Sequence, residues 1–215
     1  MRILVVGANG QIGSKLVSML QEDDRYTPVA MVRKEEQSEK FQSEGIDTVL
    51  ADLEGPVKDL ENAVKGNDAI IFTAGSGGST GLDKTLLIDL DGAVKVMEAA
   101  ENTHVNRFIL VSALQAHNRK NWNEELKPYY VAKHYADKML EASNLDYTIV
   151  RPGGLLNEPG TDNIQLGLNL ERGSIPREDV ARTLLEVISA QNSYRKAFDV
   201  ISGEVAIEKA VKEIN

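Results

Sequence analysis

The chain has no cysteine, and this absence excludes several kinds of chemistry at once. Without thiols it can form no disulfide, no cysteine nucleophile, no iron–sulfur cluster and no cysteine-ligated zinc site. It has only three histidines, His104, His117 and His134, and no two of them are spaced as ligands on one helical turn. We therefore expect no metal site.

Long apolar runs and an excess of positive charge are also missing. No stretch approaches the roughly 20 apolar residues of a membrane-spanning helix. The apolar run at residues 3–6 is too short for a signal peptide, which predicts a cytoplasmic protein. Acidic residues outnumber basic ones by 33 to 24, so the formal net charge is −9. Because this charge repels phosphate backbones and anionic lipid, we expect neither nucleic acid nor a membrane as partner. The expected partner is a small-molecule substrate.

Short apolar runs alternate with longer amphipathic stretches along the 215 residues. Valine- and isoleucine-rich runs are typical of strands buried on both faces of a parallel sheet. The alternation predicts an α/β fold, a doubly wound parallel sheet of the Rossmann type with helices on both faces. Strands are predicted at residues 3–6, 28–32, 48–51, 69–73, 108–111, 147–150 and 198–201. Helices are predicted at residues 12–21, 57–64, 82–101, 129–143, 178–189 and 205–213.

The predicted helix at 82–101 shows the clearest periodicity. Its apolar residues recur every three or four positions, which predicts a single buried face made by Leu86, Leu90, Val94 and Met97. We find no repeat and no linker, so residues 1–215 are expected to form one NAD(P)-binding domain. Within it, residues 152–215 are expected to supply the substrate side together with the last strand and helix.

The strongest motif follows the first predicted strand and opens the first helix, where residues 7–13 read GANGQIG. Gly7 permits a tight turn, Gly10 lets the backbone approach a pyrophosphate, and Gly13 lets the helix pack closely on the sheet. The phosphate then lies on the unpaired N–H groups at the positive end of the helix. The motif predicts a dinucleotide site with contacts from Gly7, Asn9, Gly10, Gln11, Ile12 and Gly13.

The end of the second strand indicates which dinucleotide binds. A site selective for NAD has an acidic residue there to accept from the ribose 2′-hydroxyl, whereas this chain has Arg33. Because an arginine can pair with a 2′-phosphate, we expect NADP, with NADPH preferred over NADH. The alternative is a solvated charged loop, since Glu35 and Glu36 follow. Further cofactor contacts are expected after the third and fourth strands, from Asp52, Leu53, Ala74 and Gly75.

Catalytic candidates lie in the helix opened by Pro128. Tyr129 and Lys133 are four residues apart, so their side chains share one face of the helix. A phenol can donate a proton to a developing alkoxide, an adjacent ammonium eases that transfer, and the Ser112 hydroxyl can polarise the same carbonyl. The alternative is structural: Tyr129 or Tyr130 is a core aromatic and the lysine extends to water.

Together these motifs resemble the atypical short-chain dehydrogenase/reductase (SDR) group, the small NAD(P)-binding Rossmann proteins akin to the NmrA-like and flavin/biliverdin reductase-like proteins. The most specific part of the resemblance is the run from Asp146 to Leu155, which contains Arg151-Pro152-Gly153 after the sixth strand. The other matching segments are GANGQIG at 7–13, VR at 32–33, DL at 52–53, AGSGGSTG at 74–81, VS at 111–112, YYVAKHYAD at 129–137 and REDVA at 177–181.

The resemblance implies about seven parallel strands in the order 3-2-1-4-5-6-7. It implies that Ser112, Tyr129 and Lys133 match a Ser–Tyr–Lys triad, and that Lys133, Pro152 and Gly153 also contact the cofactor. The leading hypothesis is an NADP(H)-dependent oxidoreductase that reduces a small carbonyl or related electrophile. A non-catalytic NADP(H) sensor and a flavin or tetrapyrrole reductase are the alternatives. The protein is expected to be a monomer, or a homodimer that uses the helices at 82–101 and 129–143.

Overall fold

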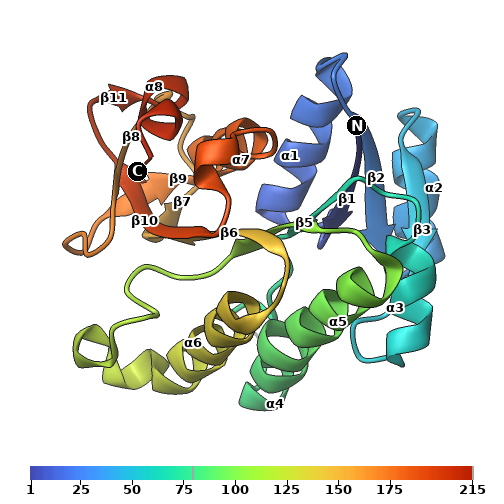
Figure 1. Cartoon of the computed structure of the whole chain (residues 1–215), viewed down its shortest axis with the longest axis horizontal. Coiled ribbons are helices and arrows are strands. Elements are labelled where there is room, and N and C mark those ends of the chain that lie inside the picture. Colours follow the sequence, from blue (N-terminus) through green and yellow to red (C-terminus); the bar gives the residue numbers. More distant parts are fainter. Residues whose placement is uncertain (79, 215) are drawn as a thin grey trace.

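The computed structural model describes residues 1–78 and 80–214, and a nine-stranded sheet forms the centre of that part (Figure 1). Seven strands run parallel, as expected, in the order β3-β2-β1-β4-β5-β6-β10. In that order they are β3 (Asp47–Leu50), β2 (Thr27–Val32), β1 (Arg2–Val6), β4 (Ala69–Phe72), β5 (Arg107–Val111), β6 (Asp146–Pro152) and β10 (Lys196–Ser202).

Two strands that the sequence did not predict extend the sheet beyond β10. These are β8 (Asn163–Gly167), which pairs antiparallel with β10, and β11 (Val205–Ala206), which pairs antiparallel with β8. The first turn of the helix expected at 205–213 is thus a short strand, and α8 (Ile207–Lys212) follows it. A separate parallel pair, β7 (Gly154–Leu156) and β9 (Ser174–Pro176), lies beside the sheet.

Helices cover both faces of the sheet, which confirms the Rossmann-type architecture (Figure 1). One face carries α1 (Gln11–Glu22), α2 (Glu35–Ser43), α7 (Arg177–Val187) and α8. The other face carries α3 (Val57–Val64), α4 (Leu82–Lys84), the π-helical η1 (Thr85–Gly92), α5 (Ala93–Thr103) and α6 (Lys127–Ala142). Short 3₁₀ turns are η2 (Arg119–Asn121), η3 (Glu124–Leu126) and η4 (Gln191–Ser193).

Alternation along β1 explains why both faces are apolar. Side chains of successive residues in a strand point to opposite faces. Ile3 and Val5 accordingly join the core under α1 and α7, whereas Leu4 and Val6 join the core under α3 and α5. All four are fully buried, so β1 can lie only between two helical layers.

The sequence missed α2 because this helix carries almost no apolar face. Of its nine residues, EEQSEKFQS, Ser38 and Phe41 are the buried ones. Glu35 and Glu36 lie in its first turn, where carboxylates interact favourably with the positive end of a helix. The charged loop considered for residues 33–36 is therefore, from Glu35 onward, the start of a helix.

The buried face expected for residues 82–101 is wrong in its first half. Leu86 is 53% exposed and Leu90 and Val94 are half-buried, whereas Met97 is buried. The cause is η1, because a π-helical turn is wider than an α-helical one and changes which residues share a face. The buried residues of η1 are instead Thr85, Asp89 and Gly92.

This rotation leaves apolar side chains on the outside of η1. Leu86 and Leu87 are exposed there, and Tyr135 and Met139 are exposed on the neighbouring α6. They lie on the two helices that the sequence indicated for a contact between subunits. The homodimer remains a prediction.

Arg107 connects the start of β5 to the end of α7. Its guanidinium is buried and donates hydrogen bonds to the carbonyls of Val187, the last residue of α7, and of Ile188, which follows it. It also donates to the carbonyl of Asp146. It also lies over the Tyr194 ring, 4.2 Å from its centroid. A cation at this end of a helix satisfies carbonyls that have no partner within the helix.

We predict that Arg107→Met lowers the free energy of unfolding by about 2–4 kcal/mol, because several buried carbonyls lose their donor. Urea unfolding followed by circular dichroism measures the change. The control is Arg182→Met, an exposed arginine on α7 that pairs with Asp162 and should cost less than about 0.5 kcal/mol. Equal losses for the two variants would contradict the assigned role of Arg107.

Candidate functional site

The parallel sheet gathers the predicted site residues along one edge, where the carboxyl ends of its strands lie. Ligands of open α/β sheets bind in the crevice outside this edge. The connections that leave the edge carry Gly7 after β1, Arg33 after β2, Asp52 and Leu53 after β3, Ala74 and Gly75 after β4, and Ser112 after β5, while Pro152 ends β6 and Gly153 follows it.

The glycine turn has the geometry that its sequence predicts. Gly7 has a φ of +86°, and a Cβ there would lie 2.6 Å from the Ala74 backbone nitrogen. A Cβ on Gly13 would lie 2.3 Å from the Gly7 carbonyl oxygen. Both glycines are therefore required by close backbone approach, Gly7 to the β4 connection and Gly13 to the turn itself.

The first turn of α1 is open to an anion. Its N-cap residue is Gly10, and within the described residues no side chain forms a capping hydrogen bond with the helix. Its first turn contains no acidic residue. Asn9, Gly10 and Gln11 are exposed there, whereas Ile12 is buried. Since first-turn N–H groups have no acceptor within their own helix, they fit a pyrophosphate.

A cavity of ≈ 370 Å³ lies at the ends of β2 and β3. It is lined by Arg33, Leu50, Ala51, Asp52, Gly55, Asp59 and Asn62. Arg33 is exposed, so its guanidinium is available to a ligand. Leu53 is buried against η1. A Cβ added to Gly92 would lie 3.1 Å from the Leu53 Cβ.

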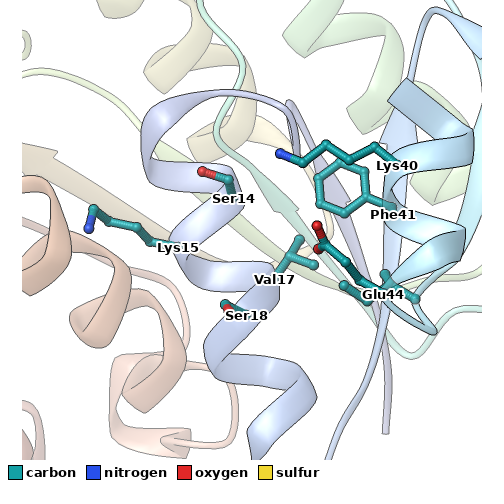
Figure 2. Close-up of a pocket in the computed structure, with 8 residues that line it drawn as sticks. Ser14, Lys15, Val17, Ser18, Lys40, Phe41 and Glu44 are labelled. Atoms are coloured by element: carbon teal, nitrogen blue, oxygen red, sulfur yellow. The ribbon is translucent and has the colours of Figure 1, made fainter. Parts of the chain in front are cut away.

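Figure 2 shows a second cavity, of ≈ 260 Å³, between α1 and α2. Lys15 points from it toward α7, where its ammonium is 3.8 Å from Glu178, and Lys40 lies beside the Phe41 ring. This cavity is on the α1 face of the sheet, whereas Tyr129 and Lys133 belong to α6 on the other face. We assign it no part in the candidate active site.

Lys133 lies inside the protein and does not extend to water. Its side chain is 5% exposed, and its ammonium donates to the Val111 carbonyl at 3.2 Å and pairs with Asp89 Oδ1 at 3.1 Å. It is 5.8 Å from the centroid of the Tyr129 ring. The alternative of an extended surface lysine is therefore wrong, and the structure brings Tyr129 and Lys133 together.

The neighbouring tyrosine is the packing residue of the pair. Tyr130 is buried and stacks on Trp122 at 5.9 Å between ring centroids, in a small cluster with Ala113 and Ala116. Tyr129, by contrast, is half-buried at the rim of this cluster. The two adjacent tyrosines thus have distinct surroundings.

Ser112 is buried next to a second charged pair. Asp137 accepts from the Arg151 guanidinium at 2.8 Å, and both side chains are almost fully buried. Burial raises the pKa of Asp137, and the charge of Arg151 and the nearby Ser112 hydroxyl oppose that rise only in part. Neither Ser112 Oγ nor Asp137 Oδ1 has a partner of full hydrogen-bond geometry among the described residues. The Ser112 hydroxyl is thus buried beside the Asp137–Arg151 pair without a fully formed hydrogen bond.

Burial and the neighbouring charges together set the ionisation of Tyr129 and Lys133. Burial raises the pKa of the Tyr129 phenol, and the Lys133 ammonium opposes that rise in part. Burial alone would lower the pKa of Lys133, but attraction from Tyr129 and Asp89 outweighs it, and the pKa lies above its usual value. At neutral pH the site thus holds a neutral phenol beside a charged lysine, which suits proton donation.

Sequence reasoning missed Asp89, Asp137 and the buried role of Arg151. Asp137 carried a usable signal, because it lies four residues after Lys133 and so continues the Tyr129–Lys133 face of α6. No sequence signal marked Asp89, because Asp91 has a similar sequence context and yet is exposed, whereas Asp89 is buried. Only the π-helical turn distinguishes them.

Comparison with known proteins identifies the family. The chain belongs to the NAD(P)H-binding family, whose model matches residues 7–191. It is 58% identical to an uncharacterized sugar epimerase of Bacillus subtilis, YhfK, over the full length of both chains. A putative NAD-dependent epimerase/dehydratase from Bacillus halodurans is 42% identical over 99% of each chain, with a TM-score of 0.93.

A more distant solved structure is that of ChuY, an anaerobillin reductase from Escherichia coli O157:H7. It is 25% identical, has a TM-score of 0.81, and the match covers 95% of this chain and 98% of that one. These findings confirm the resemblance to the atypical SDR and biliverdin reductase-like group, and with it a nicotinamide cofactor. Within the described residues, no helix is long and apolar enough to cross a membrane.

We predict that Gly13→Ala weakens NAD(P)H binding by more than about tenfold, because α1 must move away from the Gly7 carbonyl and carry its N–H groups with it. Fluorescence titration with the reduced cofactor measures the loss. Gly66→Ala is the control: its φ of +83° makes it costly to folding, but it precedes β4 at the opposite edge of the sheet. Binding as tight as wild type in a folded Gly13→Ala protein would disprove the role of the turn.

Proposed function

We propose that this protein is an NADP(H)-dependent reductase that acts on a small carbonyl or related electrophile. The observation that carries the proposal is the buried Lys133 ammonium beside Tyr129, close to Ser112 and at the cofactor edge of the sheet. An ammonium costs several kcal/mol to bury, and packing alone does not require one there. The cofactor supplies the hydride, and the chain supplies binding, orientation and the proton.

The roles of the side chains follow from their surroundings. Tyr129 donates its phenolic proton to the oxygen that gains charge, and Lys133 stabilises the phenolate that remains. Ser112, whose hydroxyl has no full partner, orients the same oxygen. Lys133 would also hold a hydroxyl of the nicotinamide ribose, and Pro152 and Gly153, at the carboxyl end of β6, would contact the cofactor.

Selection of NADP(H) is assigned to Arg33. It is exposed, follows β2 and lines the cavity at the ends of β2 and β3. In this type of fold an arginine near this position accommodates a 2′-phosphate. Asp52 lines the same cavity, while Ala74 and Gly75 lie across the edge at the end of β4. We propose that these residues hold the adenosine half and the nicotinamide half respectively.

We predict that Arg33→Ala weakens NADPH binding by about tenfold to a hundredfold and leaves NADH binding unchanged, because a hydrogen-bonded charge contributes roughly 1.5–3 kcal/mol. Both cofactors are titrated by fluorescence. Arg25→Ala is the matched control, since it removes the same charge at the opposite edge of the sheet, where Arg25 pairs with Asp23. If NADH and NADPH bind equally to wild type and to Arg33→Ala, Arg33 has no part in selection.

We predict that Tyr129→Phe lowers kcat at least about a hundredfold on any carbonyl that wild type reduces, with NADPH affinity unchanged, because the proton donor is lost. NADPH oxidation at 340 nm over a panel of aldehydes, ketones and quinones measures this. The control is Tyr130→Phe, which removes the hydroxyl of the adjacent stacked ring and should retain turnover. Unchanged kcat in Tyr129→Phe would exclude this residue as the donor.

A second candidate is a reductase of a linear tetrapyrrole, and the likeness to ChuY favours it. Leu155 and Leu156 of β7 and Leu168 after β8 are exposed and offer apolar surface on the substrate side. A tetrapyrrole in the same panel tests this, since its reduction is visible as a change in absorbance. Tetrapyrrole turnover that persists in Tyr129→Phe would favour this candidate. NADPH binding without turnover of any compound would instead favour the non-catalytic NADP(H) sensor.

A further inference from the structure

Asp199 is a buried carboxylate that the proposed reaction does not use. It lies on β10, opposite Arg151 of β6, and is fully buried. Within the described residues it forms no ion pair, since Arg151 pairs with Asp137 instead. Burial raises the pKa of Asp199, and hydrogen bonds from two backbone N–H groups oppose that rise. Buried charges are usually paired with an opposite charge, so a carboxylate held only by backbone donors points to a particular role for those donors.

The two donors belong to segments that are far apart in sequence. Asp199 Oδ1 accepts from the Gln115 N–H at 3.3 Å, and Oδ2 accepts from the Leu170 N–H at 3.1 Å. Gln115 lies in the segment between β5 and α6, whereas Leu170 lies in the connection between β8 and β9. One carboxylate thus joins two connections on the substrate side of the sheet.

Gln115 joins the same two connections through its side chain. Its Nε2 donates to the Leu170 carbonyl at 2.7 Å, and its Oε1 accepts from Asn121 Nδ2 at 2.9 Å. The Gln115 backbone has a φ of +64°, a left-handed conformation that is unfavourable for most residues other than glycine. Glycine would avoid this cost but would lose both side-chain contacts.

The two connections meet at two further points. Arg172 Nη2 donates to the Asn121 carbonyl at 2.7 Å, and His117 Nε2 lies 3.0 Å from Asn169 Oδ1. The contact between the connections is therefore made by several side chains, with Asp199 at its buried end.

These two segments, residues 115–122 and 168–172, form what we call the substrate wall. The first segment begins three residues after Ser112. Trp122, at the end of that segment, packs against the same small apolar cluster as Tyr129. The substrate wall therefore starts beside the proposed reacting centre.

We propose that Asp199 is a positioning residue that holds the two segments of the substrate wall together and so determines which substrates fit beside Ser112 and Tyr129. The proposal rests on the proposed reductase function. Asp199 acts through the backbone of Gln115 and Leu170 and does not itself touch the substrate.

Asparagine has the shape of aspartate but cannot replace it here. A carboxylate has two accepting oxygens, whereas an amide has one oxygen and one donor group. Asp199→Asn can therefore satisfy only one of the Gln115 and Leu170 N–H groups and sets a donor against the other. Loss of a hydrogen bond to a charged group should increase local opening about tenfold to a hundredfold.

The experiment is amide hydrogen exchange of the ¹⁵N-labelled protein, followed by NMR with no substrate present. Asp199→Asn should speed exchange of the Gln115 or the Leu170 N–H about tenfold to a hundredfold, while the amides of β1 exchange as in wild type. Asp162→Asn is the matched control. It removes the same charge from another connection on the substrate side, but Asp162 is exposed and pairs with Arg182, so exchange in the substrate wall should not change.

Steady-state kinetics with the carbonyl panel provide the second measurement. Asp199→Asn should raise KM at least about tenfold for the bulkiest substrates and leave kcat and NADPH affinity near wild type, because the substrate wall positions the substrate and donates no proton. Gln115→Gly suits the left-handed backbone and removes both side-chain contacts. It should show the same division between KM and kcat, and it provides the test if Asp199→Asn does not fold.

Three results would overturn the proposal. The first is wild-type exchange of both N–H groups in Asp199→Asn. The second is faster exchange throughout β1 and β5 as well, since that indicates a loss of global stability and not a local opening. The third is an unchanged KM for every substrate in a variant whose substrate wall exchanges faster.

The outcomes also separate this proposal from the proposed reaction. Faster exchange confined to the substrate wall, in a protein that reduces no carbonyl, would retain Asp199 as the residue that joins the two segments and reject the reductase. Turnover that depends on Tyr129, with wild-type exchange in Asp199→Asn, would retain the reductase and reject the role of Asp199.

Discussion

Charge buried under the cofactor edge has to be paired, and the arrangement of α6, η1 and β6 follows from that constraint. Lys133 and Arg151 are almost fully buried cations, and each has one buried carboxylate against it, Asp89 and Asp137 respectively. Losing one partner of such a pair typically costs about 3–5 kcal/mol. The two pairs therefore fix where α6 lies relative to both neighbours, and Tyr129 is carried by the helix that they hold.

The glycine turn is held by a different constraint, which is the space available to the backbone. Gly7 and Gly13 leave no room for a Cβ, so the β1–α1 turn lies against the β4 connection and the helix starts close to the sheet. The β4 connection is held in turn by Asp89 through Ser76. The cofactor edge and the catalytic side chains are thus joined by one connection, residues 73–76, and neither can shift without the other.

Much of this architecture could be predicted because the relevant signals are local. Apolar runs gave the seven parallel strands, and GANGQIG placed the turn at the end of β1. The spacing of Tyr129 and Lys133 placed them on one face of α6. The strand β11 was missed because it has only two residues, and β8 because Ile164 is the one fully buried residue among its five, so that it forms no apolar run. The helix α2 was missed because its single large apolar residue, Phe41, gives no periodicity.

Asp89 shows what local patterns do not contain. Its burial depends on a π-helical turn, and that turn is stable here because the carboxylate it directs inward finds a lysine from α6 and an N–H from the β4 connection. Those partners are 44 and 13 residues away in sequence, so no window around Asp89 reveals them. π-Helical turns are rare and occur often at functional sites, since the rearranged side chain must be compensated by its new contacts. The same turn explains why Leu86, which was expected in the core, is exposed. The π-helical geometry that directs Asp89 inward directs Leu86 toward the surface.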